Sequence, residues 1–187
     1  MRMELSLCTK DSFEDVLRIY SDMVYRLAFS RVKNTHDAND ITQDVFLKYI
    51  RADKTYNDEE HRKAWLIKTT VNTSKTLVLS SWNRRRSSVE FTDEALSGAD
   101  AFSNNEIERF ETKSVVLSAV MDLPKKYRTV IHLFYYEDLP LTAICQATGQ
   151  TLNTVKSHLH RARNMLKEKL NNLGDFKEIG VDFNDFS

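Results

Sequence analysis

Apolar residues recur at alternating steps of three and four along most of this chain, and no other feature constrains its fold as strongly. The first such series consists of Phe13, Leu17, Tyr20, Val24 and Leu27. This spacing places apolar side chains on one face and predicts an amphipathic helix over residues 11–33. The chain of 187 residues contains only four Gly and two Pro, too few for the many tight turns of an all-β fold. The sequence therefore predicts an all-α protein.

The same periodicity predicts two groups of helices, separated by a stretch that lacks it. Helices over residues 37–51 and 59–82 complete a first group of three, which must pack together to be stable. A second group opens at Pro124 and ends with helices over residues 141–148 and 152–170. We therefore expect two small domains, a flexible acidic linker and an acidic tail. Their predicted bounds are 8–87 and 114–173 for the domains, 88–113 for the linker and 174–187 for the tail.

The net charge of zero hides a strong asymmetry along the chain. Residues 1–88 hold 16 Lys and Arg against 12 Asp and Glu, and residues 114–173 hold 8 against 4. Residues 89–113 hold 2 against 7, and residues 174–187 hold 1 against 4. Two basic regions thus alternate with two acidic ones. Each basic region is a candidate electrostatic footprint for nucleic acid.

Composition and motifs argue against several other classes of protein. No apolar run reaches the roughly eighteen residues of a transmembrane helix, and the N-terminus lacks a signal pattern. We therefore expect a cytoplasmic protein with no membrane insertion. Cys8 and Cys145 are too few for a disulfide framework or a four-ligand zinc site. Because no glycine-rich phosphate loop, nucleophile elbow or HExxH motif is present, we expect no metal, no cofactor and no enzymatic activity.

Residues 141–170 have the spacing of a helix-turn-helix. Gly149 lies in a three-residue turn, Cys145 stands four residues before it, and Val155 stands six residues after it in the expected core. Such a pair places the start of its second helix in the major groove. The candidate base and phosphate contacts are Asn153, Thr154, Lys156, Ser157, His160, Arg161 and, close behind them, Arg163. The plainer interpretation is an ordinary helical hairpin with a charged face.

The second of these helices resembles the recognition helix of bacterial RNA polymerase sigma factors, through the run NTVKSHLHRAR at residues 153–163. Leu123-Pro124 followed by Arg128 resembles the entry to the same domain. In the first domain, DANDITQDVFL at residues 37–47 resembles the polymerase-binding helix of the family. Trp65-Leu66 with Val71-Asn72-Thr73 and Lys75 resembles its minus-ten-element helix. With no further domain between them, these motifs resemble the extracytoplasmic-function (ECF) class.

The resemblance implies a promoter-recognition subunit that binds core RNA polymerase and promoter DNA, promotes DNA opening and starts transcription of a specialised regulon. It also implies an anti-sigma factor as a regulatory partner. The implied polymerase-binding residues are Asp40, Ile41, Gln43, Asp44 and Val45. The implied minus-ten contacts are Lys63, Lys68, Asn72, Lys75, Arg84, Arg85 and Arg86. The residues of the helix-turn-helix would read the minus-thirty-five element.

Two positions depart from the family pattern. The first helix of the helix-turn-helix lacks the usual acidic residue, and Gln150 replaces the usual apolar residue after the turn glycine. We expect Leu152 to supply the missing packing. The main alternative function is a one-component helix-turn-helix repressor or activator that does not bind core polymerase.

Overall fold

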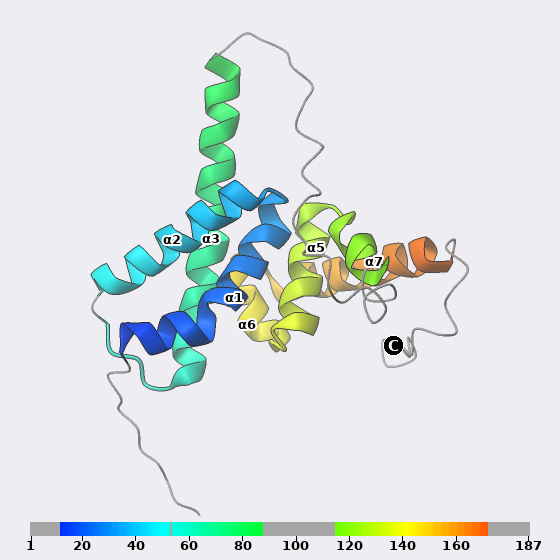
Figure 1. Cartoon of the computed structure of the whole chain (residues 1–187). Helices are drawn as coiled ribbons and strands as arrows, with labels where there is room; N and C mark the ends of the chain where they lie inside the picture. The colour runs from blue at the N-terminus through cyan, green and yellow to red at the C-terminus, as the bar shows by residue number, and fades with distance from the viewer. Residues whose placement is uncertain (1–11, 53, 88–114, 172–187) are drawn as a thin grey trace, which may run out of the picture.

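The computed structural model describes residues 12–52, 54–87 and 115–171, and for 78–87 it describes the backbone alone. Figure 1 draws these helices in colour. The predicted linker and acidic tail lie outside the described residues. Every element of the described part is helical, so the prediction of an all-α fold is confirmed.

The N-terminal lobe consists of α1 (Phe13–Val32), α2 (Thr35–Ala52) and α3 (Glu59–Ser87). The Ser12 hydroxyl accepts a hydrogen bond from the Glu14 N–H at 3.3 Å and caps the start of α1. Lys33 ends α1 in the left-handed conformation with φ 57°, and its N–H bonds the Phe29 carbonyl. Three apolar faces meet in the core of this lobe. Its fully buried side chains include Val16, Val24, Leu27, Ile41, Val45, Leu66, Ile67 and Val71.

The C-terminal lobe begins with a helix at residues 115–121 and continues with α5 (Lys125–Ile131). A π-helical turn, η1 (His132–Tyr136), follows without a break, and the Glu137 N–H bonds the His132 carbonyl at 3.2 Å. The apolar spacing after Pro124 predicts a helix here but does not indicate the π turn. The π turn holds one additional residue and carries Glu137 into a buried position.

Helices α6 (Leu141–Thr148) and α7 (Leu152–Asn171) form the predicted helix-turn-helix. Gly149 has φ 71°, and its N–H bonds the Cys145 carbonyl at 2.8 Å, which ends α6 in a left-handed cap. The Thr151 hydroxyl accepts the Thr154 N–H at 3.3 Å and caps α7. The expectation for Leu152 was wrong, because its side chain is 41% exposed and does not fill the core.

The two lobes pack against each other in the structure. Helix α5 lies against α1, and α6 lies against α3 (Figure 1). The residues that hydrogen-bond across this contact are Ser30, Arg31, Lys63 and Lys75 on the N-terminal side, and Arg128, Thr129, Glu137 and Thr148 on the C-terminal side. We call this set the seam, and the arrangement that it holds the closed arrangement.

Candidate nucleic-acid interface

Helix α7 separates a buried apolar face from an exposed polar one. Val155, Leu159 and Ala162 are buried against the rest of the C-terminal lobe. The opposite face carries five exposed side chains, which we call the recognition row. It consists of Asn153, Lys156, Ser157, His160 and Arg161. The buried face of α7 is packed in the core of the lobe, so the helix is held in place while the recognition row faces solvent. A helix that reads the major groove needs this arrangement.

Two predicted contacts of α7 have other roles in the structure. The Thr154 hydroxyl lies 2.8 Å from the Thr151 hydroxyl within the cap of the helix. The Arg163 Nε donates to the Tyr135 hydroxyl at 3.0 Å, and its guanidinium lies over the Phe134 ring. Both side chains therefore hold the fold of the lobe, and neither stands with the recognition row.

A basic and aromatic cluster borders the recognition row. The Lys126 ammonium lies over the Tyr127 ring, 4.9 Å from its centre, and this ring meets His158 edge to face. A hydrogen bond from Arg161 lowers the pKa of the Tyr127 phenol. Burial, with Lys126 and Arg161 nearby, lowers the pKa of His158. This cluster joins the start of α5 to the recognition row, and the sequence motifs did not point to it.

The predicted minus-ten residues do not share one face of α3. Lys68, Asn72 and Lys75 are exposed and lie within one face, since they are three to seven residues apart. Lys63 is nine residues from Asn72, about two and a half turns, and so lies on the opposite side of the helix. Of the four predicted contacts whose side chains are described, the structure brings three together and separates the fourth.

Two of these cations are engaged by the C-terminal lobe. The Lys63 ammonium donates to the Glu137 carbonyl at 2.9 Å and pairs with its carboxylate at 3.4 Å. The Lys75 ammonium donates to the Thr148 carbonyl at 2.9 Å. In the closed arrangement both of these predicted minus-ten contacts therefore bind protein carbonyls.

The remaining residues of the minus-ten prediction lie at the far end of α3. The helix runs through Arg84, Arg85 and Arg86, whose side chains fall outside the described part of the structure. Trp65 is partly buried and packs edge to face against the Tyr49 and Tyr56 rings. Its packing supports a core role rather than that of a base-stacking platform.

The predicted polymerase-binding residues divide into an exposed and a buried set. Asp40, Gln43 and Asp44 are exposed on α2. Ile41 and Val45 are fully buried in the core of the N-terminal lobe, because they lie on the side of α2 that faces the other helices. Those two residues position the helix and cannot touch a partner in this structure, so their inclusion among the contacts is corrected.

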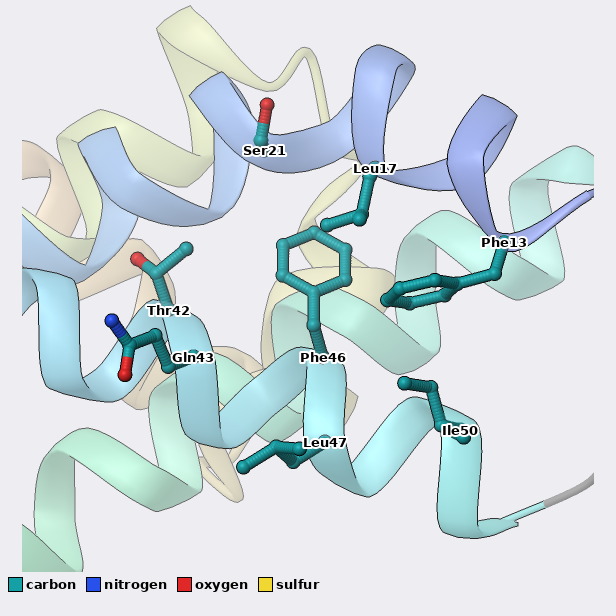
Figure 2. A pocket seen from close by; sticks show the side chains of 8 residues that line it. All are labelled: Phe13, Leu17, Ser21, Thr42, Gln43, Phe46, Leu47 and Ile50. Atoms are coloured by element: carbon teal, nitrogen blue, oxygen red, sulfur yellow. The ribbon is translucent and has the colours of Figure 1, made fainter.

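An apolar groove lies beside the exposed set. It runs between α1 and α2 and is lined by Phe13, Leu17, Ser21, Thr42, Gln43, Phe46, Leu47 and Ile50 (Figure 2). Leu47 and Ile50 are 46% and 51% exposed, high values for large apolar side chains. The signal in the sequence was present: these two residues extend a second apolar stripe along α2, away from the core stripe that Ile41 and Val45 form.

Two further features of the described residues bear on the class of protein. None of their helices is both long and apolar enough to cross a membrane. No cluster of three or more His, Cys, Asp or Glu side chains among them could hold a metal ion.

Comparison with known proteins agrees with this geometry. Sigma-70 region 2 matches residues 16–84, and Sigma-70, region 4 matches residues 114–166. The chain is 32% identical over 146 residues to the RNA polymerase sigma factor SigV of Bacillus subtilis, covering 78% of this chain and 83% of the relative. It is 26% identical over 177 residues to the ECF RNA polymerase sigma factor SigW of the same organism, covering 88% and 91%.

A solved structure shares the fold. The sigma factor RpoE from Bartonella quintana, in complex with the anti-sigma factor NepR, superposes with a TM-score of 0.66 at 22% identity, covering 87% of this chain and 98% of that one. Region 2 contains the helices with the groove, and region 4 contains the recognition row. The chain belongs to the sigma-70 family of RNA polymerase sigma factors, in its extracytoplasmic-function class, and is a promoter-recognition subunit of RNA polymerase.

Proposed function

We propose that the recognition row of α7 reads the minus-thirty-five element, and that Lys68, Asn72 and Lys75 of α3 contact the minus-ten element. The observation that carries this assignment is the exposed polar face of α7, whose opposite face is anchored in the core. Amide, hydroxyl and guanidinium groups on one face can pair with base edges and phosphates. The role of the protein is to position core polymerase, which performs the chemistry of RNA synthesis in the cytoplasm.

We infer that α2 and the groove dock core polymerase. The groove offers Leu47 and Ile50 as apolar anchors, while Asp40 and Asp44 add negative charge beside it. Apolar anchors supply affinity in protein interfaces, and charges at their rim supply orientation and rate. The same surface suits an anti-sigma factor, as the solved relative binds one. An anti-sigma factor that covers the groove would compete directly with polymerase.

The test of the whole assignment is reconstitution with purified core polymerase, followed by mapping of transcript starts on genomic DNA. We expect starts that share one minus-ten and one minus-thirty-five element. A chain that binds DNA sites but neither binds core polymerase nor starts transcripts would be a one-component regulator instead.

The docking surface has a separate test. Asp40→Arg and Leu47→Asp should each lower affinity for core polymerase at least tenfold. The first reverses a charge beside the groove, and the second replaces an apolar anchor of the groove with a charge. Glu60→Arg, an exposed charge reversal on α3, should leave that affinity unchanged. Equal losses in Asp40→Arg and Glu60→Arg, with none in Leu47→Asp, would show that net charge and not the groove governs binding.

A further inference from the structure

Four cations meet at the seam. Arg31 comes from α1, Lys75 from α3, and Lys125 and Arg128 from α5; we call these four the cation cluster. Arg31 and Arg128 are buried, with only 6% and 4% of their surface exposed. Lys125 is half-buried and Lys75 is exposed, so the cluster extends from the interior of the seam to the surface.

Within the described part of the chain, the hydrogen bonds of the cluster all reach neutral acceptors. Arg31 donates from Nη1 to the Thr129 hydroxyl at 2.8 Å, while its buried Nε has no acceptor among the described residues. Lys75 donates to the Thr148 carbonyl. Among the described residues, Arg128 donates only to main-chain oxygens, which belong to Ser30, Met121 and Leu123.

No described carboxylate forms an ion pair with the cluster. Burial lowers the pKa of Arg128 and the charge of the Asp122 carboxylate opposes this shift, but this carboxylate is exposed and accepts a hydrogen bond from Lys169 at 2.9 Å. The four charges therefore repel one another. Burial, followed by the charges of Arg31, Arg128 and Lys75, lowers the pKa of Lys125 to about 8. Burial and the charge of Arg128 lower the pKa of Arg31 to about 10.

We propose that the cation cluster is a binding site for a small multivalent phosphate anion, such as pyrophosphate or the diphosphate of a nucleotide. Guanidinium and ammonium donors from three helices converge there, and a buried guanidinium nitrogen is left without an acceptor. Charge-assisted bonds from Arg and Lys to phosphate oxygens are strong, and a phosphate would supply negative charge that no described carboxylate gives the cluster. Lys75 and Lys125 provide the approach from solvent.

The site exists only while the lobes are packed, because Arg31 and Lys75 belong to one lobe and Lys125 and Arg128 to the other. A ligand that binds one of two arrangements favours it by a factor of 1 + [L]/Kd. The anion therefore holds the chain in the arrangement that engages Lys63 and Lys75. This regulation goes beyond promoter recognition, and its tests need neither polymerase nor DNA.

The first test is calorimetric titration of the full-length chain with pyrophosphate, with inorganic phosphate and ADP as comparison ligands. We expect pyrophosphate to bind, Lys125→Gln to weaken it at least tenfold, and Lys126→Gln to change it less than twofold. Lys126 is the matched control, since it is the next residue in the chain and faces Tyr127 outside the cluster. ADP binding as tightly as pyrophosphate identifies the diphosphate as the recognised group, and tighter ADP binding indicates a nucleotide as the source. Absence of pyrophosphate binding, or equal losses in both variants, would overturn the site.

The second test asks whether the anion acts at the seam. Fluorophores at Arg51→Cys on α2 and Asn164→Cys on α7, with Cys8 and Cys145 replaced by Ser, report the distance between the lobes. Pyrophosphate should raise the closed fraction relative to KCl of equal ionic strength, and Lys125→Gln should abolish that response. Binding that leaves the closed fraction unchanged, or lowers it, would place the anion elsewhere and refute the proposal.

Discussion

The two surfaces that we propose for DNA binding differ in what they contact in the closed arrangement. The recognition row of α7 stands in solvent, with its support buried beneath it. Helix α3, which we propose for the minus-ten element, has two of its predicted cations, Lys63 and Lys75, bonded to carbonyls of the other lobe. The recognition row is thus accessible as it stands, whereas on the proposed minus-ten surface Lys75 must first release the Thr148 carbonyl.

This difference indicates an order of events at a promoter. Binding through the recognition row costs no rearrangement, so the minus-thirty-five element can be engaged first. Contact of the proposed minus-ten surface with DNA must replace the bond from Lys75 to the Thr148 carbonyl with a bond to a phosphate or base. The recognition row and the seam can be altered separately. Three sets of substitutions and one change of pH test the difference between the two proposed DNA surfaces.

We expect the largest effect from substitutions in the exposed recognition row, which should lower DNA affinity. The double substitution Lys156→Ala and Arg161→Ala should weaken binding to minus-thirty-five DNA by about 2–4 kcal/mol, since a good side-chain contact to a base pair is worth roughly 1–3 kcal/mol. The salt slope of binding should fall by about one for each lost phosphate contact. Fluorescence anisotropy with a labelled duplex measures both. Lys167→Ala, which removes an exposed cation outside the row, is the control. An equal loss of DNA affinity in this variant would contradict the proposal that the recognition row contacts DNA.

We expect the second-largest effect from a substitution that removes a hydrogen bond of the seam. In Thr129→Val the Nη1 of Arg31 loses its hydroxyl acceptor, and a buried unsatisfied donor costs about 1–3 kcal/mol. The closed fraction should fall, and affinity for single-stranded minus-ten DNA should rise, while minus-thirty-five binding stays constant. Distance measurements between the lobes and anisotropy report the two outcomes. Thr142→Val, on the exposed side of α6, should change neither. A constant closed fraction in Thr129→Val would show that this bond does not hold the lobes.

The turn of the helix-turn-helix should give a smaller effect. A Cβ added at Gly149 would have no atom within 4 Å, so Gly149→Ala causes no clash. It should lower the free energy of unfolding by about 1 kcal/mol, because alanine is strained in the left-handed conformation. We expect a lower Tm in thermal unfolding, with DNA affinity unchanged below the transition. A loss of affinity without a change in Tm would mean that the turn itself contacts DNA.

The smallest effect should be that of pH. The pKa of Lys125 is lowered to about 8 in the closed arrangement, where Arg31, Lys75 and Arg128 face it, and its ordinary value is 10.5. The closed arrangement thus binds fewer protons between these values, and it should gain population as pH rises from about 8 to 10. Because Lys125 is half-exposed, solvent screening should limit the gain to roughly two- to fivefold. Distance measurements in chloride buffer would show it, and Lys125→Gln should flatten the curve. A fall with rising pH would contradict the assigned cause.

The helices and the recognition row could be predicted from the sequence because both depend on local spacing. Gly149 marked the turn, and the step from Val155 to Leu159 marked the buried face of α7. The seam could not be predicted in this way, since Arg31 and Thr129 are 98 residues apart and neither belongs to a motif. The docking prediction named Ile41 and Val45, whose spacing had already indicated the buried side of α2, beside exposed residues of its other face. It missed the second apolar stripe with Leu47 and Ile50, which lies outside the core spacing.

The wide turn η1 also affects how this chain aligns with its relatives. A π turn carries one residue more than the α-helical turn it replaces, so the residues after it are rotated by about 100°. Here that rotation carries Glu137 to the ammonium of Lys63. In a relative that lacks one residue between positions 132 and 136, a different side chain would face that ammonium. A one-residue gap in this short window of an alignment would therefore distinguish sigma factors that can form this ion pair from those that cannot.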